Sequence, residues 1–268
     1  TMTDSVTSIE DQAFSACRKL KDINLSNSIV SIEYRLFDCC ESLSSIYIPK
    51  YVTSIEGGAF QNCSSLTDIN IPSSVTSIGS YSFASCLNLN NIDIPDSVTS
   101  IGESAFEYCR QLTNIRIPNS ISSIEKSTFM KCEKLTSINI PNSVTAIKNN
   151  AFNGCTNLSV LKIPNSVTLI GESAFYNCTN LTDVNIPNSI KTIEFSTFSG
   201  CHSLNSIYIP NSVSSIGSCA FFDCYRLMDV IIPGGVTSIK GDAFSGKNGY
   251  NPIKKNFFFY GNAPSVTD

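Results

Sequence analysis

The chain contains 268 residues, of which 42% are hydrophobic and only 15% charged, and its formal net charge is -4. This composition is typical of folded proteins and excludes collagen-like and disordered chains. No apolar run approaches the roughly 18 residues that a membrane-spanning helix needs, so no membrane insertion is expected. No signal peptide is recognised within these residues either. A pI near 5.1, with only the isolated basic pair Lys254 and Lys255, argues against a nucleic-acid partner.

A 23-residue period organises the sequence. A Cys recurs every 23 positions ten times without an insertion, a Phe stands three residues before each Cys, and a Leu stands three residues after it. An eleventh Phe, Phe244, keeps this phase. A fixed period of this length is the signature of a solenoid, whose repeats bury their apolar faces only by stacking on one another. The ten cysteines in phase are Cys17, Cys40, Cys63, Cys86, Cys109, Cys132, Cys155, Cys178, Cys201 and Cys224.

The first half of each repeat is illustrated by residues 97–109. The segment 97–101, Ser-Val-Thr-Ser-Ile, is rich in β-branched residues and predicts a short strand on one side of the solenoid. Gly102 shares its repeat position with Glu in other repeats, so a positive φ is not expected there. The stretch 103–109 is too short for a normal helix and predicts one helical turn or a bend.

The second half of the repeat, Leu-x-x-Ile-x-Ile, predicts the main parallel sheet. Its alternation directs Ile115 and Ile117 inward and Asn114 and Arg116 outward. Pro118 follows directly and has no N–H group to give to a sheet, so it ends the strand. Because a Pro recurs at this position in most repeats, the strands are expected to end at one height.

The repeats occupy residues 1–246, about ten and a half copies, and residues 247–268 are irregular. Val266 lies seven residues later than the period predicts from Val236, which indicates an irregular repeat, a partial cap or a junction. Neither end of the chain shows the polar capping sequence that repeat arrays need. We therefore expect the sequence to be part of a longer protein, with any signal or anchor outside it.

The pattern Leu-x-x-Ile-x-Ile-Pro-x-Ser-Val-x-x-Ile-x-x-x-Ala-Phe-x-x-Cys closely resembles the BspA-like class of leucine-rich repeat proteins over residues 3–246. The resemblance implies a right-handed leucine-rich repeat solenoid, α/β by convention but dominated by β-structure. Its main sheet would be parallel, with short strands and turns on the opposite side. The resemblance also implies a cell-surface or secreted location, and several relatives are described as adhesins that bind host matrix proteins such as fibronectin or fibrinogen. It brings no residue-level ligand motif.

The cysteines predict structural thiols. Stacked Cys residues about 4.8 Å apart fall within the Cα separation that a disulfide allows. Every repeat, however, holds the same Cys at the same inward position, whereas pairwise bridges would make alternate interfaces different. Buried Cys is a good small apolar residue, so we expect reduced thiols in the core. Cys39 and Cys219, which lie out of register, are the only candidates for exposed or reactive thiols.

The sequence predicts neither a metal site nor an enzyme. Zinc sites use close pairs of Cys with His partners, but the cysteines here are 23 residues apart and the only histidine is His202. No nucleophile-elbow or phosphate-loop motif surrounds any Ser or Lys. We expect no cofactor.

The outward face of the predicted main sheet carries the functional hypothesis. Two residues of each repeat point away from the core there, and they vary while the core positions barely change. These residues could simply be solvated strand residues, but Tyr, Arg and large apolar side chains are over-represented at interface hot spots. The candidate ligand face consists of Tyr47, Asp68, Asn70, Asp93, Arg116, Lys162, Asp183, Tyr208, Asp229 and Ile231.

The resemblance and this face together predict a non-catalytic recognition module. Its expected partner is a protein, either a host matrix or plasma glycoprotein or a protein of a neighbouring cell surface. Two alternatives stay open. The array could be a structural stalk that spaces another domain from the surface, or its polar face could bind glycans.

Overall fold

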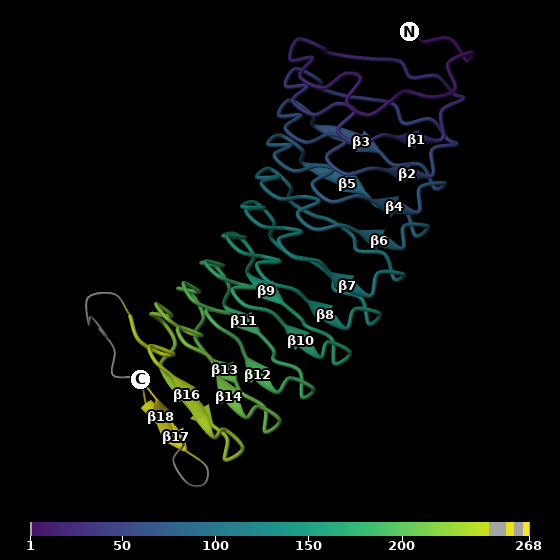
Figure 1. Ribbon diagram of the computed structural model, residues 1–268. Helices are drawn as coiled ribbons and strands as arrows, with labels where there is room; N and C mark the ends of the chain where they lie inside the picture. The colour runs from purple at the N-terminus through teal and green to yellow at the C-terminus, as the bar shows by residue number, and fades with distance from the viewer. Residues whose placement is uncertain (1, 247–255, 260–264, 268) are drawn as a thin grey trace. The chain divides into compact units, whose positions relative to one another are not determined.

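The structure is a computed structural model that describes residues 2–246, 256–259 and 265–267. Short parallel strands of two to four residues are the only regular elements in these ranges (Figure 1). The fold is a parallel-strand solenoid of the leucine-rich repeat type, as the sequence predicts. The chain divides into two compact units, unit 1 with residues 1–121 and 127–138, and unit 2 with residues 122–126 and 139–268.

One row of strands, the Ser-Ile row, is formed by the β-branched segment that begins each repeat. Its strands pair in parallel, and their register advances by 23 residues along most of the row. In unit 1 the sheet runs β1 (Ser31–Ile32), β2 (Ser54–Ile55), β4 (Ser77–Ile78), β6 (Ser100–Ile101). In unit 2 one sheet contains β7 (Ser123–Ile124), β8 (Ala146–Ile147) and β10 (Leu169–Ile170). A second sheet of unit 2 contains β12 (Thr192–Ile193), β14 (Ser215–Ile216), β16 (Ser238–Lys240) and β18 (Ser265–Thr267).

The other row, the Ile-x-Ile row, is the predicted main sheet, and it also pairs in parallel. Among the described residues, its sheets contain two or three strands, whereas those of the Ser-Ile row contain three or four. They are β3 (Asp68–Asn70) with β5 (Asn91–Asp93) in unit 1, and in unit 2 β9 (Val160–Leu161) with β11 (Asp183–Val184), and β13 (Ile207–Tyr208), β15 (Asp229–Ile232) and β17 (Asn256–Phe259).

Threonine side chains explain why the Ser-Ile row is so regular. The hydroxyl of Thr76 donates to the backbone carbonyl of Thr53 at 3.2 Å, and that of Thr99 donates to the carbonyl of Thr76 at 3.2 Å. These side-chain bonds run in the same direction as the backbone bonds, so each repeat is tied to its neighbour twice.

The Phe side chains form a stacked column through the core of each unit. In unit 1 the rings of Phe14 to Phe129 lie with centroids 5.4 to 5.7 Å apart in consecutive repeats. In unit 2 the rings of Phe152 to Phe244 lie 5.1 to 5.6 Å apart. Offset aromatic stacks add about 0.5 to 1.5 kcal/mol per pair beyond the area that they bury. The core of each repeat therefore consists of the Phe, the two inward Ile residues, the Leu and the Cys. Stacking of these cores stabilises the array.

The segment that precedes each Cys is a turn with two left-handed residues rather than a helical turn. Tyr81 and Ser85, for example, both have a φ of 59°. The N–H groups of Tyr81, Phe83 and Ser85 donate to carbonyls of the next repeat at 2.9, 2.9 and 2.7 Å, whereas the intervening amides bond within the turn. A left-handed residue other than Gly costs about 1 kcal/mol or more. Here that cost is offset because alternate amides are directed toward the next repeat, which gives a third ladder of hydrogen bonds.

Glycine at the first position of this turn has a different role. Gly79 is not left-handed, as the sequence predicts. A Cβ at Gly79 would lie 2.5 Å from the backbone nitrogen of Gly57 in the preceding repeat. Gly is therefore used where two repeats approach closely.

The irregular repeat is four residues longer than the 23-residue period. The position of Val266 in the sequence suggested a displacement of seven residues instead. Val266 pairs with Ile239, and Phe258 pairs with Ile231, so both registers advance by 27 residues. The sequence alignment placed Val266 at the Ser-Val position, whereas it occupies the Ile position of the Ser-Ile row. Lys254 and Lys255 lie outside the described residues.

Candidate functional site

All ten residues of the candidate ligand face are exposed at the outward positions of the Ile-x-Ile row. The strand patterns alternate as expected, exposed then buried, for example in β3 and β15. Each of these exposed residues has at least one buried apolar residue directly beside it in the chain. Five members, Tyr47, Asp68, Asn70, Asp93 and Arg116, lie in unit 1, and five, Lys162, Asp183, Tyr208, Asp229 and Ile231, lie in unit 2.

In unit 1 the face is a polar column that ends in an exposed ion pair. Tyr47 bridges to Asn70, and Asn70 pairs with Asp93, so these three residues lie side by side in consecutive repeats. Arg116 holds the same position in the repeat that follows, and its Nη2 lies 2.6 Å from Oδ1 of Asp96. Both side chains are exposed, so the pair contributes little to stability. It orients the guanidinium group toward Asp96 of the preceding repeat.

In unit 2 three residues at the corresponding repeat position form an apolar stripe, which we define as Tyr208, Ile231 and Phe258. Tyr208 pairs with Ile231, and Ile231 pairs with Phe258, so the three side chains stand one strand apart on one face. Their exposed fractions are 64%, 43% and 52%. Sequence reasoning missed Phe258 because the insertion of four residues shifts it out of the 23-residue period. The Phe257 to Phe259 run was the signal that could have revealed it.

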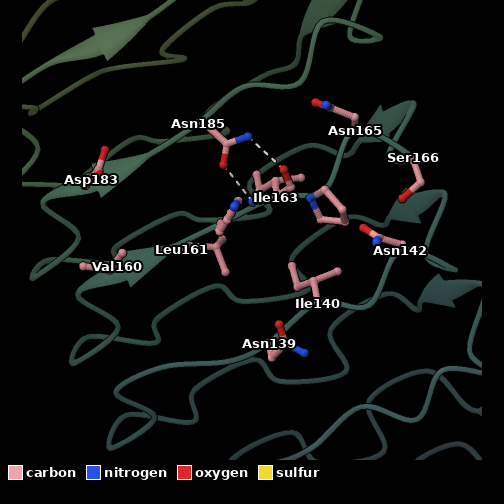
Figure 2. A pocket seen from close by; sticks show the side chains of 12 residues that line it. Asn139, Ile140, Asn142, Val160, Leu161, Ile163, Asn165, Ser166, Asp183 and Asn185 are labelled. Carbon is pink, nitrogen blue, oxygen red and sulfur yellow. Dashed lines mark hydrogen bonds between the residues drawn. The ribbon is translucent and has the colours of Figure 1, made fainter.

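Lys162 and Asp183 border a hollow of about 990 Å³ that lies entirely within unit 2. Figure 2 shows Asp183 and the other labelled residues that line it. Its floor includes Ile140, Ile163 and Pro164. Polar side chains form the rim, and besides Lys162 and Asp183 they include Asn139, Asn142 and Asn165. These three Asn residues do not stand out in the sequence, since Asn is frequent at the same positions of other repeats.

Asn185 shapes the hollow. Its Oδ1 accepts a hydrogen bond from the N–H of Ile163 at 2.8 Å, and its Nδ2 donates to the carbonyl of Ile163 at 2.8 Å (Figure 2). The pairing between β9 and β11 ends just before Asn185, at Val184. The side-chain amide therefore takes the place of the next backbone pair, and it satisfies the backbone of Ile163 at the floor.

The thiols in phase hydrogen-bond to the preceding repeat. Cys63 Sγ donates to the Phe37 carbonyl at 3.2 Å, and the same contact recurs in buried repeats of both units. All twelve cysteines are free. Burial raises the pKa of the Cys40 thiol to about 12, and burial also raises the pKa of Cys63. Such thiols are weak nucleophiles at neutral pH, since the thiolate is the reactive form.

The cysteines out of register are only half-buried, yet they are not activated. Burial and a hydrogen bond to the Asp38 carboxylate raise the pKa of Cys39. Burial and the charge of Asp242 raise the pKa of Cys219. Cys39 and Cys219 are not the only accessible thiols, because Cys17 in the first repeat is exposed. The sequence placed Cys17 in the core with the other cysteines in phase, and that placement is wrong for the first repeat.

His202 packs on an aromatic ring of the next repeat. Its ring centroid lies 5.0 Å from that of Tyr225. Within the described ranges, no three His, Cys, Asp or Glu side chains come together as a metal ion would require. The same part of the chain has no helix with the length and apolarity to cross a membrane.

Comparison with protein families identifies the repeat. Six copies of the BspA type leucine rich repeat region match residues 1–112, 76–201 and 122–251. No curated protein matches the chain.

Solved structures with the same fold come from several bacteria. A leucine rich cell surface protein from Faecalibacterium prausnitzii A2-165 is 32% identical, with a TM-score of 0.63 over 94% of this chain and 69% of that one. A leucine-rich repeat protein from Bacteroides ovatus ATCC 8483 is 26% identical, with a TM-score of 0.53 over 90% of this chain and 83% of that one. The pneumococcal vaccine antigen PcpA is 21% identical, with a TM-score of 0.65 over 97% and 67%, which supports the fold alone.

Proposed function

Because the chain belongs to the BspA-type leucine-rich repeat family, we propose that it is a non-catalytic recognition module at a cell surface. The proposed ligand is a protein, either a host matrix or plasma glycoprotein or a protein of a neighbouring cell. The proposed binding surface is the part of the candidate ligand face that lies in unit 2, together with the apolar stripe. The cell-surface location is supported by the relative from Faecalibacterium prausnitzii, which is described as a cell surface protein.

The apolar stripe is the observation that carries this proposal. Three large side chains that are 64%, 43% and 52% exposed stand in register on adjacent strands. Exposed apolar groups that gather in this way mark interaction surfaces more often than scattered ones do. Tyr is also enriched among the residues that dominate binding energy. Because the strand pairing fixes the backbone at all three positions, binding would have to order only the exposed side chains.

A binding screen tests the proposal. The chain is immobilised and exposed to fibronectin, fibrinogen, laminin, collagen and mucin, and association is followed by biolayer interferometry. The test variant carries Tyr208→Ala and Ile231→Ala, and the control variant carries Tyr51→Ala. Tyr51 is a matched control because its side chain is 58% exposed but lies outside the candidate ligand face.

We expect saturable binding to at least one protein, weakened at least tenfold in the test variant and unchanged in the control. Binding that both variants retain would move the site away from the stripe. Absence of binding to all five proteins would contradict the proposal and favour the structural stalk.

A further inference from the structure

We propose that the hollow beside Asn185, which overlaps the candidate ligand face at Lys162 and Asp183, binds a neutral oligosaccharide. The site lies within unit 2, and its rim contains Lys162 and Asp183 together with Asn139, Asn142 and Asn165. It differs from the apolar stripe in chemistry, because its rim is polar and the stripe is not. The inference therefore goes beyond protein recognition.

The rim offers the groups that sugar hydroxyls need. Each hydroxyl both donates and accepts, and each Asn amide offers two donors and an acceptor on one planar group. Within the described part of the chain, no hydrogen bond occupies the side-chain amides of Asn139, Asn142 or Asn165. Asn185 is in a different position, because its amide is used by the backbone of Ile163. The amides of Asn139, Asn142 and Asn165 are thus available to a ligand, while that of Asn185 is bonded to the backbone of Ile163.

The apolar part of the lining can contact the C–H face of a sugar ring. Val160, which is 53% exposed, and the half-buried Pro164 present aliphatic carbon beside the polar rim residues, whereas Ile140 and Ile163 are only 5% and 1% exposed. A pyranose ring has one face of C–H groups and an edge of hydroxyls, so it can cover this apolar lining while its edge reaches the amides. Ligand sites with a mostly apolar lining and a few orienting polar groups are the usual kind in proteins.

The repeat spacing favours a chain of sugars over a single one. Asn142 and Asn165 occupy the same repeat position in adjacent repeats, and so do Asn139 and Lys162. Adjacent repeats present these groups about 4.8 Å apart. That spacing is close to the length that one pyranose ring adds to a β-1,4-linked chain. A volume of about 990 Å³ accommodates more than one ring.

The charges of the rim favour a neutral ligand. Lys162 contributes one positive charge and Asp183 one negative charge, and both side chains are exposed. An acidic saccharide would gain from the ammonium group but would be repelled by the carboxylate. Both groups can instead bind hydroxyls, the ammonium group as a donor and the carboxylate as an acceptor.

Calorimetry and saturation-transfer NMR with the whole chain test the site. The probes are cellotetraose, mannotetraose and xylotetraose, with tetragalacturonic acid as the charged comparison and acetyl-tetraalanine amide as a peptide comparison. The test variant is Asn142→Ala with Asn165→Ala. The control is Asn188→Ala with Asn211→Ala, since these exposed Asn residues hold the same repeat position outside the hollow.

We expect at least one neutral tetrasaccharide to bind, with affinity at least tenfold weaker in the test variant and unchanged in the control. The Tyr208→Ala, Ile231→Ala variant should also retain saccharide binding, so failure of this site is distinguishable from failure of protein recognition. The proposal is overturned if no neutral probe binds, or if the two Asn variants behave alike. It is also overturned if only the peptide binds at the hollow, in which case the site recognises a peptide backbone.

Discussion

The thiol of Cys109 donates a hydrogen bond to the backbone carbonyl of Phe83 in the preceding repeat, with an Sγ–O distance of 3.1 Å. Phe83 is itself stacked on Phe106, whose ring centroid lies 5.5 Å away. The Cys of one repeat therefore fixes the backbone of the residue on which its own Phe stacks. This link explains why Cys, rather than a larger apolar residue, can serve at this position in repeat after repeat.

Replacement of this thiol should destabilise the array. We expect Cys109→Ala to lower the free energy of unfolding by about 1 to 2 kcal/mol, because it removes a buried hydrogen bond and leaves a small cavity. Cys39→Ala, at a half-buried thiol, should cost less than about 0.5 kcal/mol. Urea unfolding followed by circular dichroism measures both. Equal midpoints for the two variants would contradict the structural role of the buried thiol.

The buried thiols also predict a loss of stability in alkali. The pKa of Cys40 is about 12 in the folded chain against 9.0 for an unperturbed thiol. A raised folded-state pKa means that the stabilisation is complete below pH 9 and decreases as the pH rises from 9 toward 12. The midpoint of urea unfolding should therefore be level between pH 7 and 8.5 and decrease by pH 10.5. A midpoint that stays constant to pH 10.5 would show that these thiols ionise as easily as they do in the unfolded chain.

The same reasoning orders the thiols by reactivity. We expect iodoacetamide at pH 7.5 to modify Cys17 first, because it is exposed. Cys39 and Cys219 should follow slowly, since burial and neighbouring carboxylates raise the pKa of each. Peptide mapping by mass spectrometry after timed quenching gives the three rates. Faster modification of Cys39 than of Cys17 would contradict this order.

The core could be predicted from the sequence because the 23-residue period carries it. Phe83, Cys86 and Leu89 are fully buried, as their phase requires. The outward positions followed from the same alternation, so residues such as Tyr208 were placed correctly on the exposed face. Pattern reasoning works here because each repeat meets nearly the same neighbours.

Features that break the period or depend on the backbone could not be predicted in this way. Phe258 was missed because four inserted residues shift its register. Ser85 gives no sign of its left-handed conformation, since its neighbours impose it through the hydrogen bonds of the next repeat. The hollow escaped prediction because Asn185, whose side chain bonds the backbone of Ile163, holds a position where other repeats also carry Asn, for example Asn70 and Asn139.

The left-handed turn positions predict an unusual effect of glycine. Lys131 has a φ of 61°, so Lys131→Gly relieves a strain of about 1 kcal/mol or more while it raises the entropy of the unfolded chain. The variant should be neutral or more stable by up to about 1 kcal/mol. Lys134→Gly is the control, because Lys134 has no positive φ and should lose about 0.5 to 1 kcal/mol. Thermal unfolding of both variants measures the two changes in stability. If both variants were destabilised equally, the left-handed conformation would not determine the effect of glycine.

Asn185 should matter to stability more than an exposed strand residue normally does. Asn185→Ala leaves the N–H and carbonyl of Ile163 without the partners that lie 2.8 Å away in the wild type. We expect a loss of about 1 to 3 kcal/mol, since those groups are at least partly shielded from water. Asn139→Ala, which removes an amide without such bonds, should change stability by less than about 0.5 kcal/mol. Hydrogen exchange should also accelerate at the Ile163 amide in the first variant alone. Unchanged exchange there would mean that the side chain of Asn185 does not hold the strand, because the amide would then be protected by other contacts.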